Sequence, residues 1–127
     1  MAKPVALWST PRSISTAFDK MMRGRGDHRV FTEPFSQPYY FGPDRCSDRF
    51  PPDPDLATTN AAVWAAIDSA AEQEPVFVKE MPHQLGHDLG AEALDRFTSS
   101  FLIRDPSWSV PSYLAVWPDA TDTELGH

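Results

Sequence analysis

The sequence predicts an α/β fold in which a parallel sheet of about four strands is flanked by helices. Short apolar runs alternate with segments of helical periodicity, the order expected of strand–helix–strand units with right-handed crossovers. The chain has 127 residues, of which 41% are hydrophobic, and this is enough for one buried core. We therefore expect a single domain over residues 1–127, with a long proline-rich loop at residues 34–58.

The first strand and the helix after it form the most informative stretch. Residues 5–8 (Val-Ala-Leu-Trp) are an apolar run between Pro4 and Ser9, typical of a strand covered on both faces. From residue 14 onward the apolar side chains follow helical spacing and form one stripe, which consists of Ile14, Ala17, Phe18, Met21 and Met22. Ser13 is predicted to cap this helix, which should end near Gly24 or Gly26.

The turn between this strand and this helix predicts an anion-binding site. It combines free backbone N–H groups and the positive end of the helix dipole with the Arg12 cation and the hydroxyls of Ser13, Ser15 and Thr16. Phosphate or sulfate is the expected ligand. The order of elements matches a P-loop, but the G-x-x-x-x-G-K-[ST] motif is absent, which argues against an ordinary nucleotide kinase or GTPase. The alternative is that Ser13 only caps the helix and Arg12 is a solvated surface cation.

The rest of the chain continues the alternation of strands and helices. We expect strands at residues 28–33, 75–80 and 100–105. Helices are expected from a cap at Thr58 or Thr59 to residue 71, more weakly over residues 82–97, and at about residues 110–116, before a loop at 117–127 that carries a fresh capping sequence. In a parallel sheet ligands bind beyond the carboxyl ends of the strands. That rule places six charged residues at one rim: Arg12, Glu33, Lys79, Glu80, Arg104 and Asp105.

Charge and composition narrow the range of partners. The net charge is −7, but residues 1–30 carry six Lys/Arg and two Asp/Glu, whereas residues 31–127 carry five and sixteen. The overall sign argues against nucleic-acid binding, and the local positive surplus favours a small anionic ligand. The single cysteine, Cys46, suits a reducing compartment, and no apolar run is long enough to cross a bilayer. We expect a cytoplasmic protein with a small-molecule partner and with neither nucleic acid nor membrane.

With this rim assembled, the chain resembles bacterial-type members of the P-loop sulfotransferase superfamily, which use 3′-phosphoadenosine 5′-phosphosulfate (PAPS). Residues 9–16 (Ser-Thr-Pro-Arg-Ser-Ile-Ser-Thr) resemble the family's 5′-phosphosulfate loop, although Ile14 replaces a glycine common there. Residues 101–113 resemble its 3′-phosphate motif, in which a serine follows a strand-ending arginine by eight residues, as Ser112 follows Arg104. The resemblance runs from about residue 4 to the end. Because family members are considerably longer, it implies a truncated, P-loop NTPase-like domain.

The resemblance implies a sulfotransferase that moves a sulfuryl group from PAPS to a hydroxyl or amine of a small-molecule acceptor, with no metal. The implied ligands of the 5′-phosphosulfate are Arg12, Ser13, Ile14, Ser15 and Thr16, and those of the 3′-phosphate are Arg104 and Ser112. Lys79 and Arg12 would stabilise charge in the transition state. Glu33 is the first choice for the general base and His83 the second. The alternative for Glu33 is a carboxylate bonded to nearby loop amides.

Two other classes of function stay open. The first is a catalytically inactive, truncated nucleotide- or anion-binding module, with its exposed sheet edge covered in a homo-oligomer. The second is a divergent P-loop kinase that requires ATP and Mg²⁺. A zinc site is not expected, although His83 and His87 have zincin spacing, because Gln84 replaces the required glutamate. Cys46 has no placed base nearby in the sequence and is a poor candidate for a nucleophile.

Overall fold

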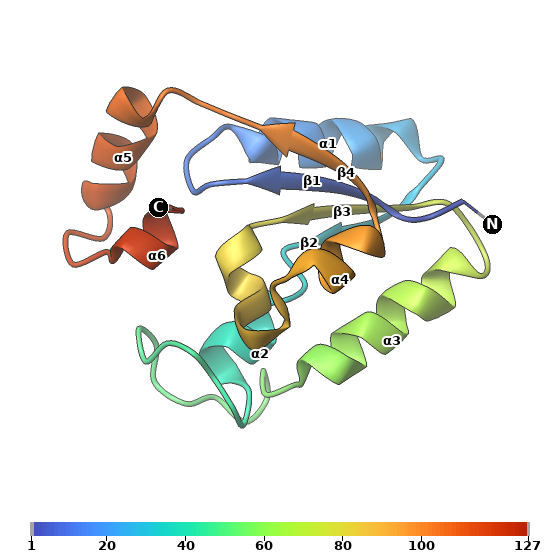
Figure 1. Cartoon of the computed structure of the whole chain (residues 1–127), viewed down its shortest axis with the longest axis horizontal. Helices are drawn as coiled ribbons and strands as arrows, with labels where there is room; N and C mark the ends of the chain where they lie inside the picture. Colours follow the sequence, from blue (N-terminus) through green and yellow to red (C-terminus); the bar gives the residue numbers. More distant parts are fainter. Residues whose placement is uncertain (1, 127) are drawn as a thin grey trace.

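The computed structural model describes residues 2–126 and contains a four-stranded parallel sheet (Figure 1). The strand order is β2-β3-β1-β4, and the strands are β1 (Val5–Ser9), β2 (Arg29–Thr32), β3 (Val76–Glu80) and β4 (Thr98–Leu102). β1 is central, with Val5 opposite Phe77 of β3 on one side and Thr98 of β4 on the other. The predicted α/β class with a parallel sheet is confirmed.

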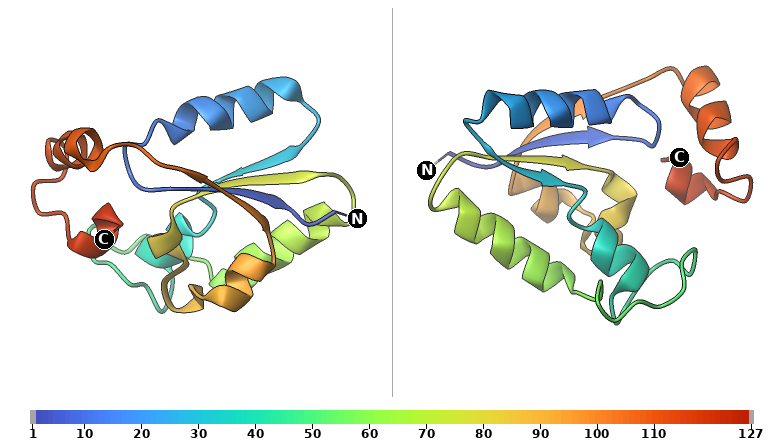
Figure 2. Two further views of the ribbon diagram at one scale, coloured as in Figure 1. Left: turned by 45° about the horizontal axis from the view of Figure 1, so that its top comes forward. Right: turned by 180° about the vertical axis from the view of Figure 1, so that it is seen from behind.

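Helices cover both faces of this sheet. The helices of the chain are α1 (Ser15–Arg25), α2 (Ser36–Phe41), α3 (Asn60–Ala71), α4 (Ala91–Asp95), α5 (Pro106–Leu114) and α6 (Asp122–Leu125), with a 3-10 segment η1 (Pro82–Asp88) between β3 and α4. α1 lies over one face, and α3 and α4 lie over the other (Figure 2). α5 and α6 lie beyond the end of the sheet at which β1 ends and the chain turns into α1 (Figure 1).

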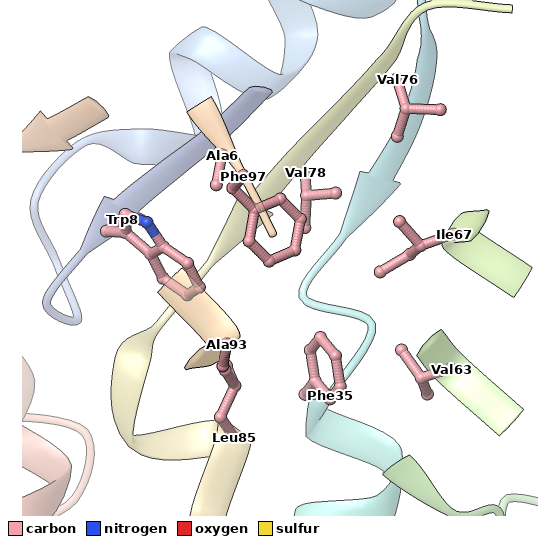
Figure 3. Packing of buried hydrophobic residues seen from close by; sticks show 10 residues of the cluster. All are labelled: Ala6, Trp8, Phe35, Val63, Ile67, Val76, Val78, Leu85, Ala93 and Phe97. Atoms are coloured by element: carbon pink, nitrogen blue, oxygen red, sulfur yellow. The ribbon is translucent and has the colours of Figure 1, made fainter. Parts of the chain in front are cut away.

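The larger core lies between the sheet and the α3/α4 layer. Its ten buried residues are Ala6, Trp8, Phe35, Val63, Ile67, Val76, Val78, Leu85, Ala93 and Phe97 (Figure 3). Trp8 packs edge-on against Phe97, with ring centroids 5.5 Å apart. A smaller cluster of Leu7, Met22 and Phe77 lies under α1. Alternate residues of β1 thus point to opposite faces, as a strand buried on both sides requires.

The fourth strand and the helix after it begin earlier than predicted. β4 pairs with β1 from Thr98 to Leu102, so its first half is polar, and Ser99 accepts a hydrogen bond of 3.0 Å from the Trp8 indole. The strand ends before residue 103, and Ile103 is 87% exposed. The helix expected at about residues 110–116 starts instead at Pro106, because the Asp105 carboxylate caps it by accepting the Ser107 N–H.

Three other segments carry more structure, or different structure, than the sequence pattern indicates. The loop at 34–58 contains α2, on which Tyr39 and Tyr40 are buried, and the loop at 117–127 contains α6. The weak helix expected over 82–97 is divided into η1 and α4, because Gly86 adopts φ 57° and ψ −123° and Gly90 is extended. A side chain at Gly86 would also come within 2.8 Å of the Cys46 sulfur. Strand β2 begins at Arg29, one residue later than expected.

β4 is an edge strand with an exposed apolar residue. Thr98, Ser99, Ser100 and Phe101 are all exposed, and Phe101 has 65% of its surface accessible. The strand carries no charged side chain, whereas the opposite edge strand, β2, begins with Arg29. Within residues 2–126, no helix has both the length and the apolar composition that a bilayer crossing requires.

Candidate anion-binding site

A pocket of about 350 Å³ opens at the carboxyl ends of the parallel strands. It is lined by Arg12, Ser13, Ile14, Ser15, Thr16, Glu33, Lys79, Met81 and Arg104. These residues come from the β1–α1 turn and the start of α1, from the segments that follow β2 and β4, and from the end of β3 with the residue after it. The topology therefore brings together residues that are up to 92 positions apart in the chain, at the sheet edge where ligands of α/β proteins bind.

The β1–α1 turn has an unusual backbone for a segment without glycine. Arg12 and Ile14 adopt left-handed conformations, with φ 62° and 66°, and the intervening Ser13 does not. Alternating backbone conformations of this kind turn successive N–H groups toward one concavity and favour an anion there. α1 begins immediately after this turn, so the free N–H groups of its first turn lie beside the pocket.

Ser13 does not cap α1, and that prediction is wrong. The N-cap position belongs to Ile14, whose side chain makes no capping bond. Ser13 is 2% exposed, and its hydroxyl shares a hydrogen bond of 2.9 Å with the hydroxyl of Thr10. The left-handed turn moves the N-cap position from Ser13 to Ile14. The Ser13 hydroxyl therefore bonds to Thr10 within the turn, and the first N–H groups of α1 have no side-chain cap.

Two hydrogen bonds connect Arg12 with Arg104 and Ser112, although Ser112 does not line the pocket. Arg104 donates from Nη1 to the carbonyl oxygen of Arg12 at 2.8 Å, and Arg12 donates from Nε to the Ser112 hydroxyl at 2.9 Å. The β1–α1 turn, the end of β4 and α5 are thereby connected by side chains at one end of the sheet. Each guanidinium has further N–H donors beyond the one used in these bonds.

Glu33 and Lys79, which both line the pocket, form a largely buried ion pair. Lys79 Nζ lies 2.6 Å from Glu33 Oε2, and the lysine side chain is 4% exposed against 25% for the glutamate. The backbone N–H of Glu33 also donates to the carbonyl oxygen of Lys79 at 2.7 Å, and Gln84 Nε2 donates to Glu33 Oε1 at 3.3 Å. Glu33 itself is left-handed, with φ 45°. Its carboxylate is therefore fixed by two side chains and by a strained backbone.

The residues that line the pocket carry a net positive charge. Three cations, Arg12, Lys79 and Arg104, face one carboxylate, Glu33, among the residues that line it. Within residues 2–126, the three non-glycine residues with positive φ are Arg12, Ile14 and Glu33, and all three line this pocket. Strain of this kind, kept at several residues around one cavity, is a feature of functional sites.

His83 does not line this pocket. It lines a second cavity, of about 680 Å³, together with Tyr39, Cys46, His87 and Glu124. The His83 ring packs edge-on against Tyr39 at 5.4 Å between centroids, and burial lowers the pKa of its imidazole below the usual range. In the part of the chain that the structure describes, no group of three or more His, Cys, Asp or Glu side chains could hold a metal ion.

Glu80 and Asp105, which the strand-end rule places at the rim, do not line the pocket. Lys79 and Glu80 are consecutive strand residues, so their side chains point to opposite faces, and alternation along β3 could have separated them. Glu80 is fully buried and accepts the backbone N–H of Phe35 at 3.0 Å and that of Met81 at 2.7 Å. Burial raises the pKa of Glu80 to about 8. Asp105 instead caps α5.

Gln84 is the site residue that sequence reasoning missed. It was notable in the sequence only as a departure from the zincin motif, yet its amide reaches Glu33 from the first turn of η1. A polar residue in the segment that follows a strand ending at the ligand edge is the signal that could have identified it.

No protein-family model, no curated protein and no solved structure matches this chain. The physical case for a function therefore rests on the pocket and on the motifs that form it.

Proposed function

We propose that this chain is a PAPS-dependent sulfotransferase, or the nucleotide-binding part of one, that works in the cytoplasm. The observation that carries the proposal is the convergence of Arg12, Lys79 and Arg104 with a helix N-terminus on one pocket. We further propose that the fold is of the truncated P-loop type. β3 lies between β1 and β2, whereas a Rossmann sheet places β2 next to β1, and this difference supports the P-loop assignment.

In the proposed complex the two phosphate-containing ends of PAPS bind to opposite sides of the Arg12–Arg104 contact. The N–H groups of the turn, Arg12, and the hydroxyls of Ser15 and Thr16 bind the 5′-phosphosulfate. Arg104 and Ser112 bind the 3′-phosphate, the group that distinguishes PAPS from ATP. The bonds from Arg104 to the Arg12 carbonyl and from Arg12 to Ser112 connect these two halves before any ligand arrives, which reduces the ordering cost of binding.

The proposed reaction moves a sulfuryl group between two oxygens, or from oxygen to nitrogen. The bond between sulfur and the bridging oxygen of PAPS breaks, and a bond forms between sulfur and the acceptor atom. The proton of the acceptor passes to the Glu33 carboxylate, and Lys79 and Arg12 stabilise the negative charge left on the departing phosphate oxygen. By analogy with phosphoryl transfer, positioning and charge stabilisation supply most of the catalysis. Glu33 is preferred to His83 as the base because it lines this pocket.

The test of this function is a comparison of nucleotides by isothermal titration calorimetry. Adenosine 3′,5′-bisphosphate should bind more tightly than adenosine 5′-phosphate, and Arg104→Ala should reduce that preference about ten-fold or more, since a charge-assisted bond is worth about 1.5–3 kcal/mol. Arg25→Ala, which removes the same charge from an exposed pair with Asp27, is the matched control and should leave the preference unchanged. Equal affinity for the two nucleotides in the unmodified protein would refute the assignment.

The exposed edge of β4 favours one second candidate, an inactive anion-binding module with this edge covered by a second copy of the chain. Phe101 is 65% exposed on a strand without charges, and such an edge favours pairing with another strand. The two candidates differ in chemistry, because only the sulfotransferase transfers radiolabelled sulfate from PAPS to a mixture of hydroxyl and amine acceptors. A divergent kinase would instead require ATP and Mg²⁺ for binding and turnover.

A further inference from the structure

The Lys79–Glu33 ion pair lies among the residues that line the pocket. Lys79 is the most buried of the three pocket cations, and its ammonium is already bonded to Glu33 Oε2 at 2.6 Å. Among residues 2–126, Arg12 and Arg104 keep N–H donors that are not used, whereas the Lys79 side chain is 4% exposed and makes no side-chain bond other than the one to Glu33. A phosphate or sulfate that reaches Lys79 therefore competes directly with the Glu33 carboxylate for this one ammonium.

We propose that Lys79 exchanges partners when the anion binds, leaving Glu33 for the phosphosulfate and so freeing the Glu33 carboxylate to accept a proton from the acceptor. In the protein without ligand, the Glu33 carboxylate occupies the position beside the Lys79 ammonium that the anion takes in the complex. This inference rests on the proposed function, since it explains how one site keeps a general base and a cation for the leaving group in contact without mutual inactivation. Binding of the anion is therefore the step that frees Glu33 to act as the general base.

The surroundings of Glu33 fit such an exchange. Its backbone is anchored to β3 by the N–H bond to the Lys79 carbonyl, which does not involve either charged group. Gln84 keeps a bond to Oε1, the carboxylate oxygen that Lys79 does not use. When Lys79 turns to the ligand, Glu33 therefore stays in place, and its Oε2 becomes the free oxygen. A flexible four-carbon side chain with rotatable donors is suited to change partners in this way.

The exchange predicts that Glu33 weakens ligand binding. Calorimetry with adenosine 3′,5′-bisphosphate should show about three- to ten-fold tighter binding by Glu33→Gln than by the unmodified protein, because the amide leaves Lys79 available. Asp68→Asn is the matched control, since it removes one negative charge from a pair with Arg96 that does not line the pocket, and its affinity should stay near that of the unmodified protein. The proposal is overturned if Glu33→Gln binds no more tightly than Asp68→Asn.

A second measurement keeps the test decisive if Glu33→Gln does not fold. In a crystal structure of the unmodified protein with adenosine 3′,5′-bisphosphate, Lys79 Nζ should lie within hydrogen-bond distance of a ligand oxygen and no longer on Glu33. A bound nucleotide with the Lys79–Glu33 bond intact would refute the exchange while leaving the proposed function standing.

Inorganic pyrophosphate shows whether the exchange of partners holds when the PAPS assignment fails. If the nucleotide does not bind but pyrophosphate does, with the same gain in Glu33→Gln, the PAPS assignment fails and the exchange of partners is supported. If neither probe binds to the unmodified protein or to Glu33→Gln, both proposals fail.

Discussion

Replacing Glu80 with Gln should remove a pH-dependent loss of stability that this carboxyl causes. Burial raises its pKa from 4.5 to about 8 in the folded chain. Between these two values the unfolded chain has lost the proton and the folded chain keeps it, so the unfolded state binds fewer protons and the free energy of unfolding falls as the pH rises. The slope is about 1.4 kcal/mol per pH unit, and the full difference corresponds to roughly 5 kcal/mol.

The Gln side chain cannot reproduce both bonds that Glu80 makes. The carboxyl group accepts N–H groups of Phe35 and Met81 on its two oxygens, whereas an amide offers only one oxygen. Glu80→Gln should therefore lose about 1–3 kcal/mol at all pH values from one unpaired N–H. The unmodified protein, by contrast, starts from higher stability near pH 5 and loses about 4 kcal/mol toward pH 8, which is more than the substitution costs, so the two curves cross.

Urea unfolding followed by tryptophan fluorescence measures this crossing, because Trp8 is buried in the core. Each protein should be unfolded at several pH values between 5 and 9. His83, whose pKa is lowered by burial, makes both proteins more stable as the pH rises toward 6.5, and its contribution cancels in the difference. Glu74→Gln, at an exposed carboxyl, should give a curve parallel to that of the unmodified protein. A parallel curve for Glu80→Gln would refute the reasoning.

Two further changes test other parts of the structure. Arg49→Met should destabilise the chain by about 3–5 kcal/mol, because Arg49 pairs at 2.6 Å with Glu124, whose side chain is 6% exposed, and its loss leaves a buried charge. Thermal unfolding checks this, and a loss below 1 kcal/mol would contradict it. Ile14→Gly should stabilise the chain by about 1 kcal/mol, since Ile14 holds φ 66° while 63% exposed; urea unfolding measures this gain, and a loss of stability would contradict it.

The parts of the fold that were predictable are those whose local pattern and burial agree. β1 and β3 are short, mainly apolar runs buried on both faces. The helical spacing from residue 14 predicts that α1 is a helix but not which face it buries, because Ile14, Phe18 and Met21 are exposed, and of the stripe only Met22 is among the buried residues of α1. β4 was misplaced because its pairing begins at polar residues: Ser99 bonds the Trp8 indole and Ser100 bonds the Ala6 carbonyl. Side-chain hydrogen bonds of this kind produce no periodic pattern of hydrophobic residues in the sequence. The short helix α2 depends similarly on tertiary burial of its tyrosines.

The location of the site could be predicted from the sequence, but only some of the contacts within it could. The strand-end rule gathers Arg12, Glu33, Lys79 and Arg104 at one edge, and these four residues do line one pocket. The same rule includes Glu80, which points to the other face. Neither the Lys79–Glu33 bond nor the bond from Gln84 to Glu33 could be read from the sequence, because both depend on the left-handed turn at Glu33.

Backbone strain connects the stability of this chain to its proposed function. Each left-handed non-glycine residue costs of order 1–3 kcal/mol, a large amount for a domain whose net stability is about 5–15 kcal/mol. At Arg12 and Glu33, glycine would relieve the strain but would also delete a charge that faces the pocket. Ile14 contributes no charge, so Ile14→Gly separates the two effects. It should gain stability and leave the affinity for adenosine 3′,5′-bisphosphate unchanged, because the turn keeps its shape and its N–H groups. Weaker binding by a more stable Ile14→Gly protein would mean that the isoleucine side chain itself contacts the ligand.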